Sequence, residues 1–174
     1  GVIGGYPDGT FKPNSLINRA EFTKIIVGAT RSEPDNGLCL ESFAQPDGSY
    51  TNMFIDVKSS FGNEGPIWYL NDLCYAKTEN LVSGYPDGSF KPASNINFVE
   101  AFKIIDNGFK LYGDGSADQP WYTIYVNLLA YQKAIPQSIT RFDQLITRGE
   151  MAEMIYRLRA EKTNLPSKTY SELQ

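Results

Sequence analysis

The strongest constraint on the fold is an internal repeat. The eleven residues from Gly5 to Ser15 read Gly-Tyr-Pro-Asp-Gly-Thr-Phe-Lys-Pro-Asn-Ser, and they recur with two changes from Gly84 to Ser94. The offset of 79 residues holds further along the chain, where Ile-Asn, Glu and Lys-Ile-Ile recur at the same spacing. A weaker third copy, Ile-Thr-Arg-Gly-Glu, occupies residues 146–150 and lacks the Tyr-Pro-Asp-Gly loop. The chain is therefore expected to consist of tandem copies of one small unit.

Each copy has the sequence of a turn-rich loop followed by a capped helix. In Tyr-Pro-Asp-Gly, proline presets φ for a turn, aspartate accepts hydrogen bonds from nearby amides, and glycine adopts a positive φ. Asn18, Asn97 and Thr147 are typical N-cap residues, and each is followed three positions later by glutamate, which is the pattern of a capping box. Apolar residues then recur at helical spacing. With the runs that follow Trp68 and Trp121, the sequence predicts helices at residues 19–29, 68–81, 98–110, 121–134 and 148–161.

These signals predict a mainly α-helical chain of tandem helix–loop–helix repeats. Its expected divisions are the second half of repeat 1, an exposed inserted loop, repeat 2, a degenerate repeat 3 and a C-terminal tail, at residues 1–30, 31–53, 54–112, 113–162 and 163–174. The insertion is rich in Pro, Asp, Gly and Ser, and it has no clear periodicity.

Repeat 1 lacks its first helix, so only five of the six helices of three repeats are expected. The last helix should then leave part of its apolar stripe, Met151, Ile155 and Leu158, without cover. Two expectations follow: either an N-terminal half-repeat is missing before Gly1, or another chain supplies the sixth helix by self-association.

Charge and residue usage exclude several classes of function. The 16 Lys and Arg against 20 Asp and Glu give a net charge of −4, which argues against a nucleic-acid surface. The chain has no His, so Ser-His-Asp and Cys-His catalysis are ruled out, and no metal or other cofactor is expected. Its apolar runs are far too short to span a bilayer. The two cysteines, Cys39 and Cys74, form one disulfide, remain reduced in the core, or bond an outside partner.

The repeated loop, followed by Ile-Asn-Arg-Ala-Glu-Phe, resembles the S-layer homology module. Phe-Ile-Asp-Val at residues 54–57, together with Trp68, is similar to the opening of that module, and the resemblance covers residues 1–30 and 54–160. It implies three modules around a pseudo-threefold axis with a central bundle of one helix per repeat. It also implies an extracellular, non-catalytic module that anchors surface proteins to cell-wall polysaccharide, often one with pyruvate ketals. Phe98 departs from the family pattern, which has arginine there.

The helix starts carry residues suited to an anionic sugar. Arg19 and Arg148 follow the N-cap, where free amides, the helix dipole and a planar guanidinium favour a carboxylate. Trp68 and Trp121 offer apolar faces for a sugar ring. The family's grooves imply that Arg19 pairs with Trp68 and Phe98 with Trp121. The Arg19 groove is predicted to be the principal site, because it alone combines an intact loop, the arginine at the helix start and a following helix with a tryptophan. The candidate ligand-binding residues are Arg19, Trp68, Asp8, Gly9, Tyr6, Lys12, Arg148 and Trp121.

Other roles are open to the same residues. The arginines suit surface ion pairs, the tryptophans suit an inter-helix core, and the acids at matched positions suit turns and caps. Those turn and cap roles also disfavour a glycosidase built on paired carboxylates.

The predicted function is a non-enzymatic cell-surface module. Its expected partner is secondary cell-wall polysaccharide or another peptidoglycan-linked glycan, with no nucleic acid and no membrane span. The alternative is a structural surface-layer module that packs against other protein copies. A location outside the reducing cytosol favours a disulfide between Cys39 and Cys74.

Overall fold

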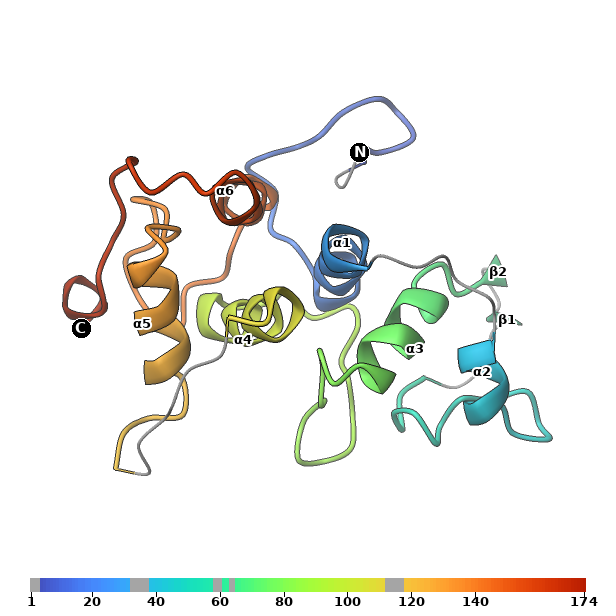
Figure 1. The fold of residues 1–174 in the computed structure, drawn as a ribbon. Coiled ribbons are helices and arrows are strands. Elements are labelled where there is room, and N and C mark those ends of the chain that lie inside the picture. Colours follow the sequence, from blue (N-terminus) through green and yellow to red (C-terminus); the bar gives the residue numbers. More distant parts are fainter. Residues whose placement is uncertain (1–3, 32–37, 58–60, 63–64, 112–117) are drawn as a thin grey trace.

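The computed structural model describes residues 4–31, 38–57, 61–62, 65–111 and 118–174, and these are mainly helical (Figure 1). The elements in chain order are α1 (Arg19–Thr30), α2 (Leu38–Phe43), β1 (Phe61–Gly62), β2 (Gly65–Pro66), α3 (Leu70–Thr78), α4 (Phe98–Phe109), α5 (Thr123–Tyr131), α6 (Arg148–Arg159) and the 3₁₀ turn η1 (Tyr170–Glu172). The strands β1 and β2 form an antiparallel pair two residues long. The predicted helical class is confirmed, and a helix occupies each of the five predicted positions.

The three predicted capping boxes are confirmed at α1, α4 and α6. The N-cap side chains of Asn18, Asn97 and Thr147 each accept from the amide of the glutamate three positions later, and that glutamate accepts from the N-cap amide. The helices α3 and α5 start without a side-chain cap, at Tyr69 and Tyr122. The repeats therefore fix the start of one helix each by local hydrogen bonds.

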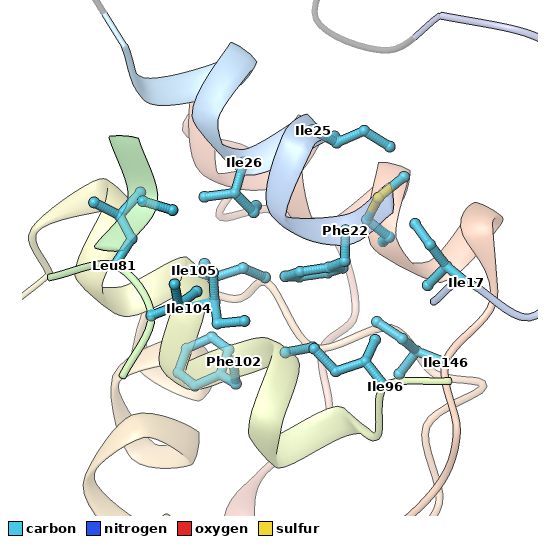
Figure 2. Close-up of a cluster of buried hydrophobic side chains, with 14 of the residues drawn as sticks. Ile17, Phe22, Ile25, Ile26, Leu81, Ile96, Phe102, Ile104, Ile105 and Ile146 are labelled. Carbon is cyan, nitrogen blue, oxygen red and sulfur yellow. The ribbon is translucent and has the colours of Figure 1, made fainter. Parts of the chain in front are cut away.

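The segments before the three capped helices join in a closed cycle of backbone hydrogen bonds. The amide of Ile17 donates to the carbonyl of Ile146 at 3.2 Å, Ile146 donates to Ile96 at 3.1 Å, and Ile96 donates to Ile17 at 3.1 Å. All three isoleucines are fully buried, and Figure 2 shows them at one end of the core. The cycle relates the three segments to each other. The pseudo-threefold arrangement of whole modules stays a prediction.

Backbone carbonyls of the same segments accept hydrogen bonds from the first amides of the capped helices. The amide of Arg19 donates to the carbonyl of Ser94 at 3.0 Å, Phe98 to Gln144 at 2.8 Å, and Arg148 to Ser15 at 2.9 Å. The prediction that free amides at these helix starts hold an anion is therefore wrong, because backbone carbonyls of the next segment already accept from them.

The core lies between α1, α4 and the helices that pack against them. Helix α1 packs against α3 and α4, and α4 packs against α5 (Figure 1). Phe22, Ile26, Phe102 and Ile105 are fully buried between α1 and α4 (Figure 2). A Cβ at Gly108 would lie 2.8 Å from the Ile26 side chain, so glycine permits the close approach of the two helices.

The insertion has more structure than the exposed loop that the sequence predicts. Helix α2 packs against α3, and Cys39 of α2 forms a disulfide with Cys74 of α3. A turn like that of the repeats follows, since the amide of Gln45 donates to the carbonyl of Ser49 at 3.0 Å. Packing and the disulfide hold a segment that has no amphipathic period of its own. Residues 32–37 of the insertion, and the predicted repeat boundary at 112 and 113, lie outside the described residues.

The predicted uncovered stripe on α6 is wrong for two of its three residues. Met151 and Ile155 are 0% and 2% exposed, and Leu158 is half-buried. Loop and tail segments contact this helix at both ends. Gly149 lies against the carbonyl of Pro13, and the Arg157 guanidinium donates to the carbonyls of Lys133 at 3.1 Å and Pro166 at 2.7 Å.

The C-terminal tail is packed rather than loose. The Tyr170 ring lies 5.0 Å from the ring of Phe142, and Leu173 is 4% exposed. The amide of Lys168 donates to the carbonyl of Ile135 at 3.2 Å, which ties the tail to repeat 3.

Candidate functional site

Two grooves of similar size lie at matched places on the repeats. Groove 1 has a volume of about 650 Å³ and is lined by Gly4, Gly5, Tyr6, Pro7, Glu21, Lys24, Ile25, Gly28, Trp68, Asp72 and Arg148. Groove 2 has a volume of about 630 Å³ and is lined by Arg19, Leu81, Val82, Ser83, Gly84, Tyr85, Pro86, Glu100, Lys103, Ile104 and Trp121. Each groove thus lies between the loop and helix of one repeat and the start of the next repeat's first helix.

The arginines lie in different grooves from those predicted. Arg148 shares groove 1 with Trp68, and Arg19 shares groove 2 with Trp121. The predicted pairs of Arg19 with Trp68 and of Phe98 with Trp121 are wrong. The cyclic pairing of the pre-helix segments explains the exchange, because it lays the start of each capped helix against the loop of another repeat. Each groove is consequently assembled from all three repeats.

In both grooves the arginine stacks on a tyrosine and bonds the backbone. The guanidinium carbon of Arg19 lies 4.6 Å from the centre of the Tyr85 ring, and its Nε donates to the carbonyl of Phe90 at 2.8 Å. That of Arg148 lies 4.5 Å from the Tyr6 ring, and its Nε donates to the carbonyl of Phe11 at 3.0 Å. Both arginines are about 95% buried, so their first role is to hold a loop of another repeat.

The capping glutamates take part in the same clusters. Glu100 accepts from the Tyr85 hydroxyl at 2.8 Å and lies 3.8 Å from the Arg19 guanidinium, and Glu21 accepts from Tyr6 at 3.4 Å. Burial and the hydrogen bond to Glu100 raise the pKa of Tyr85 to about 12. The glutamates thus combine their predicted capping role with a contact to the groove wall.

The loop residues Asp8, Gly9 and Lys12 are not among the described residues that line groove 1. Asp8 accepts from the amide and hydroxyl of Thr10, and these hydrogen bonds lower its pKa to about 2. Gly9 has a φ of +78°, as the turn requires. The Lys12 ammonium lies 3.1 Å from the Asp8 carboxylate and 4.4 Å from the centre of the Tyr6 ring. These residues shape the loop around Tyr6.

The tryptophans are open to solvent rather than part of a core. Trp68 and Trp121 are 53% and 52% exposed, and each makes an edge contact with the following tyrosine. An ammonium lies over each indole ring: Lys24 at 5.3 Å from Trp68 and Lys103 at 5.6 Å from Trp121. Sequence reasoning missed both lysines, although they recur at the same 79-residue offset as the loops.

A different cluster lies at the third matched place, where Phe98 of repeat 2 meets the loop before α6 in repeat 3. Phe98 replaces the arginine and is fully buried, with its ring stacked on that of Phe102. Glu150 accepts from the Ser138 hydroxyl at 2.7 Å and from the Gln144 amide at 3.1 Å, where the other repeats use a tyrosine. The loss of the arginine and of the tyrosine loop is thus compensated by neutral hydrogen-bond donors.

The described residues hold neither a metal-binding cluster nor a membrane-spanning helix. No group of three or more acidic, His or Cys side chains there is arranged to hold a metal ion. Within the same residues, every helix is too short or too polar to cross a bilayer.

Comparisons with known proteins agree with the resemblance of the repeats. Residues 1–23 and 62–101 match the S-layer homology domain. The chain is 28% identical over 155 residues to the "Middle cell wall protein" of Brevibacillus brevis, which covers 89% of the chain and 13% of that protein. It is 34% identical over 105 residues to the "Surface layer protein" of Brevibacillus choshinensis, covering 60% and 8%. A third relative is the "Cellulosome-anchoring protein" of Acetivibrio thermocellus, 25% identical over 157 residues, covering 90% and 32%. The chain therefore spans at most about a third of the length of these relatives.

Proposed function

On the premise that this chain carries S-layer homology sequence, we propose that it is a non-catalytic anchoring module that binds a cell-wall glycan in grooves 1 and 2. Its location is the cell surface or cell wall, as the names of its relatives state for those proteins. The relatives named for anchoring and for surface layers support a structural role over an enzymatic one.

The observation that carries this proposal is the recurrence of one set of groups in both grooves. Each groove combines a half-exposed tryptophan with a lysine, a buried arginine, a tyrosine and a capping glutamate. Residues needed only for folding do not have to leave an indole face half exposed beside a cavity. The same geometry at two places indicates a ligand that presents the same group more than once, as a polymer does.

The chemistry of the set suits a sugar with an acidic substituent. An indole face is a flat apolar surface on which the C–H face of a pyranose ring can lie. The lysine and arginine supply positive charge beside it, which favours a carboxylate such as that of a pyruvate ketal. Two grooves on one chain would let a repeating glycan bind at both, so that the two weak contacts reinforce each other.

A sedimentation assay with purified cell-wall polysaccharide tests the proposal. Trp68→Ala and Trp121→Ala should each weaken binding about tenfold, because each removes the stacking face of one groove, and the double variant should not bind. Tyr131→Ala is the matched control, since Tyr131 is 80% exposed and lines neither groove. Equal binding by the double variant and the control would overturn the proposal. Mild acid treatment, which hydrolyses ketals, should reduce binding of the unmodified chain if pyruvate is the substituent.

A further inference from the structure

The lysines of the two grooves occupy matched positions, five residues after the first residue of the capped helix. Lys24 lies in α1 and Lys103 in α4, and each places its ammonium over the indole of its groove. The buried arginines already donate to backbone carbonyls, whereas the Lys24 side chain is 50% exposed and Lys103 is half-buried. The lysine ammonium groups are therefore better placed than the arginine guanidinium groups to contact a ligand in the groove.

The two grooves differ in one charge. Groove 1 contains Asp72, whose carboxylate lies 4.0 Å from the Lys24 ammonium. The matched residue in α5, 53 positions later, is Tyr125. Among the described residues, no carboxylate lies within ion-pair distance of Lys103. Groove 1 thus has two cationic and two anionic side chains, and groove 2 has two cationic and one anionic.

The third matched place, where Phe98 of repeat 2 meets the loop of repeat 3, has no groove arginine. At the position of Lys24 and Lys103, helix α6 has Glu153, which pairs with Arg157 on the same helix. The arginine and the lysine are therefore both missing where Phe98 meets the loop before α6. Both are present in grooves 1 and 2, which have an open tryptophan. The lysine is thus found together with the groove arginine and tryptophan, and it is replaced where they are lost.

We propose that Lys103 is the residue that binds the acidic substituent of the glycan and that groove 2 is the stronger site for it. In groove 1 the Asp72 carboxylate competes with the ligand for Lys24, so groove 1 discriminates less between acidic and neutral sugars. This inference rests on the proposed function. It adds which groove, and which side chain, selects for charge.

The two tryptophans allow each groove to be observed separately. They are the only tryptophans in the chain, so the two indole N–H signals in a ¹H–¹⁵N NMR spectrum report one groove each. Trp68→Phe and Trp121→Phe assign them. The probes are the 4,6-pyruvate ketal of methyl glucopyranoside, the methyl ester of that ketal, and glucose 6-phosphate. The ester removes only the charge, and the phosphate tests whether the groove accepts any anion on a sugar.

The ketal should shift the Trp121 signal at about tenfold lower concentration than the Trp68 signal, and the ester should shift the two alike. Lys103→Gln should weaken ketal binding at Trp121 by about five- to tenfold and leave ester binding unchanged. Asp72→Asn should strengthen ketal binding at Trp68. Lys162→Gln, which removes the same charge outside both grooves, is the control and should change neither.

The results separate this inference from the proposed function. If purified polysaccharide binds but Lys103→Gln retains the ketal affinity at Trp121, the inference is wrong and the proposed function stands. The inference is also wrong if the ketal fills groove 1 first. If neither indole signal moves with any sugar or with purified polysaccharide, both are overturned. Equal effects of glucose 6-phosphate and the ketal would support the lysine's role and assign the selection to charge rather than to the carboxylate.

Discussion

The assembly of each groove from different repeats can be tested by double-mutant cycles. Arg148→Met removes a guanidinium and keeps most of the apolar stem, and Tyr6→Leu removes the ring on which the guanidinium stacks. The structure requires these two substitutions to be coupled, because the guanidinium carbon lies 4.5 Å from the ring centre. By the same geometry Arg19→Met must couple to Tyr85→Leu.

The magnitude follows from the contacts that are lost. Arg148 donates to the carbonyl of Phe11 at 3.0 Å and to that of Gly4 at 3.3 Å, and it is 4% exposed. Loss of two charged hydrogen bonds and of the stacking should cost about 3 kcal/mol of the free energy of unfolding. For a chain of this size that lowers Tm by about 6–12 °C. The part shared with Tyr6, which the cycle isolates, should be about 1–2 kcal/mol.

Urea unfolding followed by circular dichroism measures each free energy. The cross pairs, Arg148→Met with Tyr85→Leu and Arg19→Met with Tyr6→Leu, should be additive within about 0.5 kcal/mol. Arg141→Met is the control for loss of an arginine, since its side chain is 71% exposed and its ion pair with Asp143 is worth little. Coupling of Arg19 to Tyr6, with none between Arg148 and Tyr6, would refute the assembly described above.

Three other outcomes are expected. Phe98→Ala should lower the free energy of unfolding by about 3–5 kcal/mol because its ring is fully buried, yet leave glycan affinity per folded molecule unchanged; a lost affinity in a sedimentation assay would contradict this. Reduction of the bond between Cys39 and Cys74, which spans 35 residues, should lower stability by about 3–4 kcal/mol in urea, and a non-reduced intact mass without a two-dalton deficit would exclude the bond. Burial and the hydrogen bond to Glu100 raise the pKa of Tyr85 to about 12, so the neutral phenol contributes stability that is complete below pH 10 and lost as the pH rises to 12. Thermal scans across that range should show a smaller loss for Tyr85→Phe than for the unmodified chain.

The sequence by itself determined the features that depend on neighbours a few residues away. The turns at Asp8 and Asp87, and the capping boxes that start α1, α4 and α6, all form within stretches of five residues or fewer. Such contacts need no knowledge of the rest of the chain, because the bonding partners are fixed by spacing along the backbone. The family resemblance rests on the same local residues and is supported by the comparisons.

Only the tertiary structure decided which residues share a groove. Arg148 lies on the Tyr6 ring although 142 positions separate them in the sequence. The hydrogen-bond cycle of Ile17, Ile96 and Ile146 brings the start of each capped helix next to another repeat. Carbonyls of the same segments, those of Ser15, Ser94 and Gln144, accept from the helix amides that the sequence suggested were free for an anion. Nothing in local spacing encodes these contacts, because they exist only once three distant segments have closed on each other. The sequence therefore identified most of the residues of the two grooves, and the tertiary contacts between distant segments decided which of them lie together.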